Sequence, residues 1–286
     1  AISTIRCGNA IDGISDQALG PKTLTIEGGL IISMAETSAE TAVDLDLSEY
    51  TCLPGLINTH VHFDANPEDA ADYGVYARRT RDDNLALILR NAATTVHTGF
   101  TTVRHAGAWF PDTLALARAK IDAGTAIGPR IQSAGPYLTI PGGGGDLIFP
   151  EIPTDKIPAE SQQGIATTPR QFAERAKTAI NKGADFLKVI ASGAVFSTGT
   201  EPGAPEMYQD DIEAVVAVAK AHGVKVTAHV HSDQSGRDAI LAGVNSLEHA
   251  SLLSDDTIAL AVAHDVALSM DVYNGTYTDT VGRELG

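Results

Sequence analysis

The chain has 286 residues, of which 43% are hydrophobic, and a formal net charge of −16 from 20 Lys and Arg against 36 Asp and Glu. This length suits one large domain, or a large domain with a small partner, and the hydrophobic content is sufficient for a sizeable core. The acidic balance argues against nucleic acid or an anionic membrane surface as a partner, and no run approaches the ~20 apolar residues of a membrane span.

The N-terminal segment gives two indications about processing and compartment. Because the first residue is Ala1, we expect that an initiator methionine or a longer signal segment has been removed, so a soluble cytoplasmic and an exported protein both stay open. Only two cysteines are present, Cys7 and Cys52. Two cysteines in a chain of this length are not a disulfide framework, and whether they pair is left open.

Residues 1–52 have the pattern of a small β-unit. Candidate strands lie at 2–7, 23–26 and 30–34, and Gly-Asn and Gly-Gly pairs separate them. The sequence predicts that this segment belongs to a small β-domain, distinct from the domain of residues 53–286.

From residue 53 onward, strands alternate with helices, which indicates parallel βα units. The predicted strands are 53–60, 101–105, 130–134, 185–191, 225–231, 246–249 and 267–271. The predicted helices are 82–98, 112–123, 169–182, 210–222, 234–242 and 254–264. We therefore predict an α/β fold of the (β/α)8 TIM-barrel type that stops after its seventh strand, with a long Gly/Pro-rich connection at 136–168.

Histidines are the chemically informative residues of these strands. His60 and His62 end the first predicted strand and, being two residues apart, project from the same face. Two neutral imidazoles side by side suit a divalent metal. His229 and His249 end the fifth and sixth strands, so the parallel barrel would bring all four to one mouth. His231 shares the face of His229, and we interpret it as a substrate contact or a solvated rim residue.

Lys188 lies within the fourth predicted strand, between apolar neighbours on both sides. A buried ammonium group is costly without a partner. One interpretation is a structural lysine paired with a carboxylate. The other is an amine that has reacted with carbon dioxide, giving an anionic carbamate able to bridge two metal ions, which a desolvated lysine with a lowered pKa favours.

Four segments resemble the amidohydrolase superfamily, and within it the imidazolonepropionase-like branch that contains Xaa-Pro dipeptidases. The segments are Leu53–His62, Phe186–Lys188, Thr227–His231 and Leu247–His249. The resemblance covers about residues 50–270. It implies that His60 and His62 hold a more buried metal ion, that His229 and His249 hold a more exposed one, and that Lys188 bridges them as a carbamate. Two divalent ions are therefore expected, with zinc as the default.

The chain departs from the family pattern in two places. The family's general-base aspartate ends strand eight and is expected beyond Gly286, because Asp271 falls one strand early. The loop that reads Gly-Gly-His-Gly-Asp in relatives is Gly142–Asp146 here, and Gly144 replaces the histidine, which puts inherited substrate contacts in doubt. Candidate substrate-binding residues are His231, Tyr137 and Tyr273.

The predicted function is hydrolysis of an amide bond, in an Xaa-Pro dipeptide or an N-acyl amino acid, at a binuclear metal centre. The alternative within the superfamily is a mononuclear deaminase or a cyclic amide or imide hydrolase. An alternative of another class is a non-catalytic fragment or one part of a split enzyme, with the C-terminal segment as a companion chain. By the resemblance, residues 1–52 would form part of a small β-sandwich with C-terminal strands, and a homo-oligomer is expected.

Overall fold

The computed structural model describes residues 2–270 except 39, 41, 67, 70, 71 and 196, together with residues 276, 280 and 283. The chain divides into two compact units, Ala1–Leu56 and Ile57–Gly286. Each unit is described by itself below.

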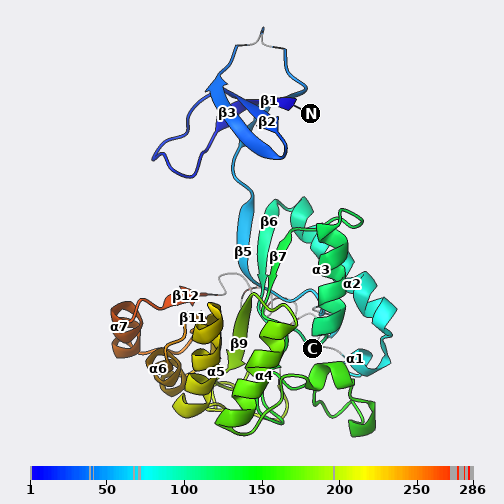
Figure 1. Ribbon diagram of the computed structural model, residues 1–286, viewed down its shortest axis with the longest axis vertical. Helices are drawn as coiled ribbons and strands as arrows, with labels where there is room; N and C mark the ends of the chain where they lie inside the picture. The colour runs from blue at the N-terminus through cyan, green and yellow to red at the C-terminus, as the bar shows by residue number, and fades with distance from the viewer. Residues whose placement is uncertain are drawn as a thin grey trace. The chain divides into compact units, whose positions relative to one another are not determined.

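The first unit is a four-stranded sheet (Figure 1). Its strands are β1 (Ile2–Ala10), β2 (Lys22–Glu27), β3 (Leu30–Glu36) and β4 (Leu45–Cys52), in the order β3-β2-β1-β4. β2 pairs antiparallel with β1 and β3, whereas β4 pairs parallel with β1. A disulfide joins Cys7 of β1 to Cys52 of β4, which answers the question of cysteine pairing.

The sequence analysis missed β4, although apolar Leu45 and Leu47 alternate with acidic residues there. β4 ends directly before the predicted strand 53–60. That strand forms as β5 (Leu56–Val61), which begins three residues later than predicted. The described residues of the first unit make a single sheet, so the sandwich remains a prediction.

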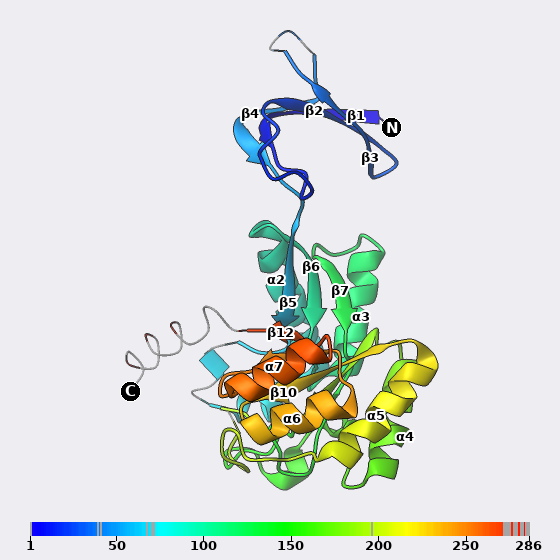
Figure 2. The same ribbon diagram turned by 90° about the vertical axis from the view of Figure 1, so that its left-hand side faces the viewer.

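The second unit carries two sheets of strands connected by helices (Figures 1 and 2). The smaller sheet has the order β5-β6-β7, with β6 (Phe100–His105) and β7 (Arg130–Ser133). The larger sheet has the order β12-β11-β10-β9-β8, with β8 (Tyr137–Leu138), β9 (Phe186–Ile190), β10 (Lys225–Val230), β11 (Ser246–His249) and β12 (Ala267–Ser269). All neighbouring strands of the larger sheet are parallel, which confirms the α/β prediction.

A kink in the chain separates the two sheets. β7 pairs with β6, but β8, which follows after three residues, pairs with β9. Between them Gly135 adopts a φ of 70°, a left-handed conformation that glycine tolerates best, and Pro136 has no N–H to donate to a ladder. The predicted third strand forms as β7, whereas β8 is a short additional strand within the predicted connection 136–168 and belongs to the other sheet.

Helices cover the two sheets on the outside (Figure 2). They are α1 (Val75–Arg78), α2 (Arg81–His97), α3 (Pro111–Asp122), α4 (Pro169–Asn181), α5 (Gln209–His222), α6 (Asp233–Ala242) and α7 (Asp255–Ala263). Local sequence fixes the start of α4, because the side chain of Thr168 accepts the N–H of Gln171. The connection 136–168 contains short 3-10 turns at Thr154–Lys156 and Ala159–Gln162.

The two sheets differ in burial. Every residue of β9 is buried, and the largest core cluster surrounds it, whereas a smaller cluster that includes Ile88 and Leu114 lies between the small sheet and helices α2 and α3. β5 and β12, the end strands of the two sheets, are mostly exposed. No backbone ladder joins them among the described residues, and the barrel predicted from the sequence is not closed there.

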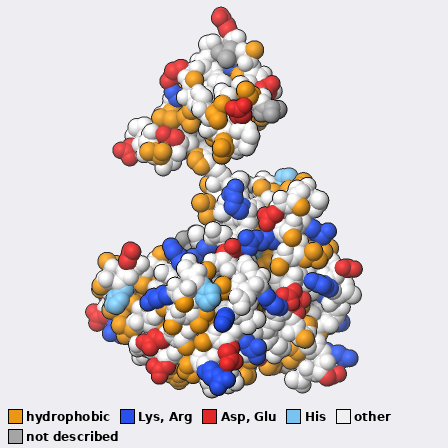
Figure 3. Space-filling view, viewed as in Figure 1, with side chains coloured by type: hydrophobic (Ala, Val, Ile, Leu, Met, Phe, Trp, Pro, Cys, Tyr) orange, Lys and Arg blue, Asp and Glu red, His pale blue; other side chains and the backbone are white. Residues whose placement is uncertain are grey.

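Two surface observations bear on partners. Among the described residues, no helix combines the length and the apolar character that crossing a membrane requires. Acidic and basic side chains both occur over the face of the second unit shown in Figure 3.

Candidate metal centre

Four histidines from three strands lie together in the second unit. His60 belongs to β5, His62 follows directly after it, His229 belongs to β10, and His249 is the last residue of β11. The ring centroids are 5.0 Å apart for His60 and His62, 4.8 Å for His60 and His249, and 4.5 Å for His229 and His249. The sequence-predicted ligands are therefore neighbours in space.

Lys188 lies at the centre of β9 and is 1% exposed. Its partner in the strand register on one side is Thr227 of β10 and on the other is Tyr137 of β8. The positive charge of Lys188 contributes to the lowered pKa values of His60, His62 and His229, so its amine is within electrostatic reach of all three rings.

Hydrogen bonds set the tautomers of His60 and His62. The Nδ1 of His60 lies 2.7 Å from Oε2 of Glu248, and the Nδ1 of His62 lies 2.9 Å from the carbonyl oxygen of Gly107. Both partners are acceptors, so both Nδ1 atoms carry the proton and both Nε2 atoms present a lone pair. The two Nε2 atoms are 3.0 Å apart. Two lone pairs facing each other at this distance fit a shared cation.

The second pair of predicted ligands supports the same conclusion. Nε2 of His229 is buried and has no hydrogen-bond partner among the residues that the structure describes. Buried polar atoms rarely lack a partner, and a metal ion would supply one. Ring nitrogens of His229, His231 and His249 all lie within 4.8 Å of one another. The structure thus places His231, predicted as a substrate contact, inside a metal-capable group, where its ring stacks on that of His249.

Burial keeps the rings of His60, His62 and His229 neutral, which is the form that binds metal. Burial, followed by the charge of Lys188, lowers the pKa of His60 to about 4. Burial also holds the pKa of His62 well below its usual value, with the charge of His60 as the next cause. The pKa of His229 is likewise far below normal because of burial and the nearby His249.

His249 has an unusual backbone. It adopts a φ of 67° and the following Ala250 a φ of 54°, a left-handed region that few non-glycine residues occupy. Such conformations cost of order 1–3 kcal/mol and persist where the surroundings enforce them, often at functional sites. The strand end is therefore bent where His249 joins the other rings.

Tyr137, a predicted substrate-binding residue, lies beside His62. Its hydroxyl lies 2.9 Å from Nδ1 of His62. A Cβ on Gly107 would lie 2.4 Å from the Tyr137 ring, so only glycine fits there. Tyr273, the other predicted substrate tyrosine, and Asp271 lie outside the described residues.

A second metal-capable group, His62, Asp64 and His105, adjoins the first. In it, Nε2 of His105 accepts the backbone N–H of Phe63 at 2.8 Å, and a carboxylate oxygen of Asp64 accepts the N–H of Trp109 at 2.8 Å. These bonds occupy Nε2 of His105 and one oxygen of Asp64 and support the backbone around His62, whereas Nδ1 of His105 is buried without a hydrogen-bond partner among the described residues.

The Gly-rich loop 142–145 packs against the end of β9. A Cβ on Gly144 would lie 2.8 Å from the backbone nitrogen of Ala194 and 2.9 Å from its Cβ. The histidine that relatives are expected to carry at this position therefore does not fit the observed loop conformation.

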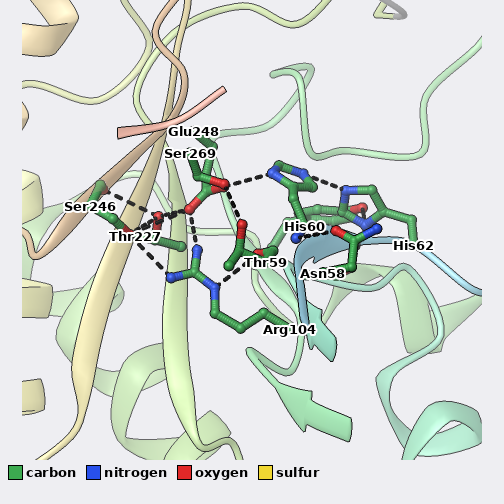
Figure 4. A network of polar contacts seen from close by, with 11 residues as sticks. Asn58, Thr59, His60, His62, Arg104, Thr227, Ser246, Glu248 and Ser269 are labelled. Atoms are coloured by element: carbon green, nitrogen blue, oxygen red, sulfur yellow. Dashed lines mark hydrogen bonds and ion pairs between the residues drawn. The ribbon is translucent and has the colours of Figure 1, made fainter. Parts of the chain in front are cut away.

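Glu248 is a site residue that the sequence analysis missed. It is fully buried and contacts His60, Arg104, Thr227 and Ser246 (Figure 4). The available signal was a glutamate directly before His249 within a predicted strand, since a carboxylate is rarely buried without partners.

The profile of the amidohydrolase family matches residues 51–283, which include every residue of this site. The chain belongs to the amidohydrolase family. Family members are metal-dependent hydrolases, which agrees with the donor groups described above. The resemblance predicted from the four sequence segments is thereby confirmed.

Individual amidohydrolases show similarity over most of the chain. Ochratoxinase from Aspergillus niger is 27% identical over 217 residues, which are 71% of this chain and 44% of the relative. The crystal structure of an Xaa-Pro dipeptidase with bound methionine superposes with a TM-score of 0.81 at 28% identity, covering 94% of this chain and 66% of that one. A prolidase complexed with N-methylphosphonate-L-proline gives a TM-score of 0.85 at 25% identity, covering 100% and 70%. The chain thus spans less than half the length of the curated relative.

Proposed function

We propose that this protein hydrolyses an amide bond at a binuclear metal centre bridged by a carbamylated Lys188. The observation that carries the proposal is the pair of Nε2 lone pairs of His60 and His62, 3.0 Å apart. In the same histidine cluster, Nε2 of His229 has no hydrogen-bond partner within the described part of the chain. Family membership supports the hydrolytic chemistry.

The residues divide into two groups of ligands. His60 and His62 would hold one ion, and His229 and His249 the other, with zinc as the expected metal for a histidine-rich hydrolytic site. Bound there, two divalent ions would polarise the scissile carbonyl and lower the pKa of water toward neutrality. Tyr137, which contacts His62, and His231, whose ring stacks on that of His249, would contact the substrate.

The bridging group requires a covalent step on Lys188. Its neutral amine attacks the carbon of carbon dioxide, an N–C bond forms, one proton leaves, and the product is an anionic carbamate. Burial favours this reaction because it disfavours the ammonium form. The change converts a cation among buried histidine rings into an anion with two oxygen ligands.

Relatives support a dipeptide or N-acyl amino acid as the substrate class. The two solved relatives described above are called a dipeptidase and a prolidase, and one holds an L-proline derivative. We propose an Xaa-Pro dipeptide or an N-acyl amino acid for this chain.

Metal analysis combined with a hydrolysis screen tests this proposal. The wild-type protein should contain close to two zinc ions per chain and hydrolyse members of an Xaa-Pro and N-acyl amino acid panel. Lys188→Ala should lower the metal content and reduce turnover by at least a thousandfold, whereas exposed Lys177→Ala on α4 should change neither. One ion per chain with deamination in place of amide hydrolysis would favour the mononuclear deaminase. Unchanged turnover in Lys188→Ala would rule out the carbamate.

A further inference from the structure

We propose that Glu248 is a positioning residue of the metal centre, which fixes the tautomer and orientation of His60 through a carboxylate held by Arg104. This inference rests on the proposed function, because it concerns a ligand of the same centre. It assigns a role to a buried charge that the hydrolytic chemistry itself does not use.

The first argument is the way the Glu248 carboxylate is occupied. Its Oε1 accepts from Arg104, from the hydroxyl of Thr227, and from that of Ser246 at 3.4 Å. Its Oε2 lies 2.7 Å from Nδ1 of His60. Three donors on one oxygen orient the carboxylate and leave the other oxygen to the imidazole, as Figure 4 shows.

The second argument is that Arg104 connects Glu248 to the strand that carries His60. The Nε of Arg104 donates to the carbonyl oxygen of Thr59 at 2.9 Å, and a terminal nitrogen of the same guanidinium donates to Glu248. The planar guanidinium therefore fixes the distance between the backbone beside His60 and the carboxylate that its ring must reach. Both ends of the His60–Glu248 hydrogen bond are held by one side chain.

The third argument is the position of these residues in the fold. Arg104 comes from β6 of the small sheet, whereas Thr227 and Glu248 come from β10 and β11 of the large sheet. The network thus links the two sheets at the level of His60, where no backbone ladder joins β5 to β11 among the described residues. At this level the side chain of Arg104 connects β5 to β11, through Thr59 on one side and Glu248 on the other.

The chemical consequence falls on Nε2 of His60. A carboxylate that accepts the Nδ1 proton excludes the tautomer with hydrogen on Nε2 and increases the basicity of that nitrogen toward a metal ion. Removal of such a partner typically weakens metal binding by about 10- to 100-fold. An amide at position 248 places an NH2 group against either Arg104 or His60, since both are donors.

Zinc affinity of the metal-free protein, measured by competition with a chromophoric chelator, tests this inference. Glu248→Gln should bind zinc about 10- to 100-fold more weakly than wild type, and Glu213→Gln, an exposed glutamate on α5, should match wild type. Long-range 1H–15N correlation of the histidine rings should show His60 protonated at Nδ1 in the wild-type protein and redistributed in Glu248→Gln. A role limited to stability would lower the melting temperature without changing the tautomer.

A folded Glu248→Gln protein with wild-type zinc affinity would overturn the inference. If that variant does not fold, the wild-type spectrum decides: hydrogen on Nδ1 of His60 supports the inference, and hydrogen on Nε2 overturns it. Failure of the proposed function gives a different result. The wild-type protein would then bind no zinc, whereas the tautomer of His60 would still report its hydrogen bond with Glu248.

Discussion

Glu206 accepts the backbone N–H of Gly144 with both carboxylate oxygens, at 2.9 Å and 3.0 Å. Glu206 is 5% exposed and follows the loop after β9, whereas Gly144 belongs to the Gly-rich loop after β8. One buried side chain therefore holds two loops together. Burial raises the pKa of Glu206, and the hydrogen bond from Gly144 opposes that rise.

Replacing Glu206 with Ala should destabilise the protein by about 1–3 kcal/mol, because the N–H of Gly144 loses its acceptor in a buried setting. Urea unfolding monitored by circular dichroism measures this change. Glu201→Ala, at an exposed position of the same loop, serves as the matched control and should fall within about 0.5 kcal/mol of wild type. Equal stability of the two variants would show that Glu206 does not hold the loop.

Adding a side chain at Gly144 should be unfavourable even for alanine. The new Cβ would meet the nitrogen and Cβ of Ala194 at 2.8 Å and 2.9 Å, so one of the loops must move. We expect a loss of about 1–3 kcal/mol in unfolding free energy. The double variant Gly144→Ala, Ala194→Gly should recover part of this loss, since it removes the Cβ of Ala194, one of the two close atoms. No recovery in the double variant would place the conflict elsewhere.

Acid should destabilise the metal-free protein through its buried histidines. Burial lowers the pKa of His60 to about 4 and that of His105 to about 3, from 6.5. The unfolded chain takes up these protons at a higher pH than the folded chain. The stabilisation that the two neutral histidines contribute is therefore complete above pH 6.5 and is lost as the pH falls through 4 and then 3. Melting temperatures measured with chelator from pH 7 to pH 4 should decrease steadily.

Asp64 changes the pH dependence of stability in the opposite direction from the buried histidines. Burial raises its pKa from 3.8 to about 6, so its contribution is complete below pH 3.8 and is lost as the pH rises through 6. Asp64→Asn keeps an oxygen for the N–H of Trp109 and removes this titration. The melting temperature of Asp64→Asn should therefore decrease more steeply with acid than that of wild type, and parallel curves would contradict the assignment.

The disulfide between Cys7 and Cys52 should contribute substantially to the first unit. The two residues are 45 positions apart, and closing a loop of this length restricts the unfolded chain by about 4 kcal/mol in the chain-entropy account. The Cys7→Ser, Cys52→Ser double variant should unfold the β1–β4 sheet at lower urea, as measured by hydrogen exchange of the sheet amides. Exchange of β9 amides provides an internal reference. Unchanged protection of both would contradict the expectation.

Local patterns predicted most of the secondary structure, because caps and apolar periodicity act over a few residues. The helix that begins after Thr168 and the strand around Lys188 form where expected. The short strand β8 after Gly135 was not predicted, because it forms only through its pairing with β9, about 50 residues further along the chain. Closure of the barrel involves the same kind of distant pairing and is not seen among the described residues.

In the site, too, features that depend on local sequence could be predicted, whereas contacts between distant residues could not. The spacing of His60 and His62 predicted two rings on one face, and the structure places them so. Glu248 was missed because its role depends on Arg104, which lies 144 residues away, and no pattern within β11 indicates that contact. His231 lies among metal-capable nitrogens because β10 and β11 are adjacent, a relationship of register that is invisible in either strand alone.

The Arg104–Glu248–His60 network also bears on the order in which the protein is assembled. His60 and Glu248 are 188 residues apart, so the complete set of donors exists only after strands from both ends of the second unit have been placed. An emerging chain offers a metal ion only local pairs, first His60 with His62 and later His229 with His231. Acquisition of metal should therefore follow folding, and an ion captured too early would bind a pair that lacks its final neighbours.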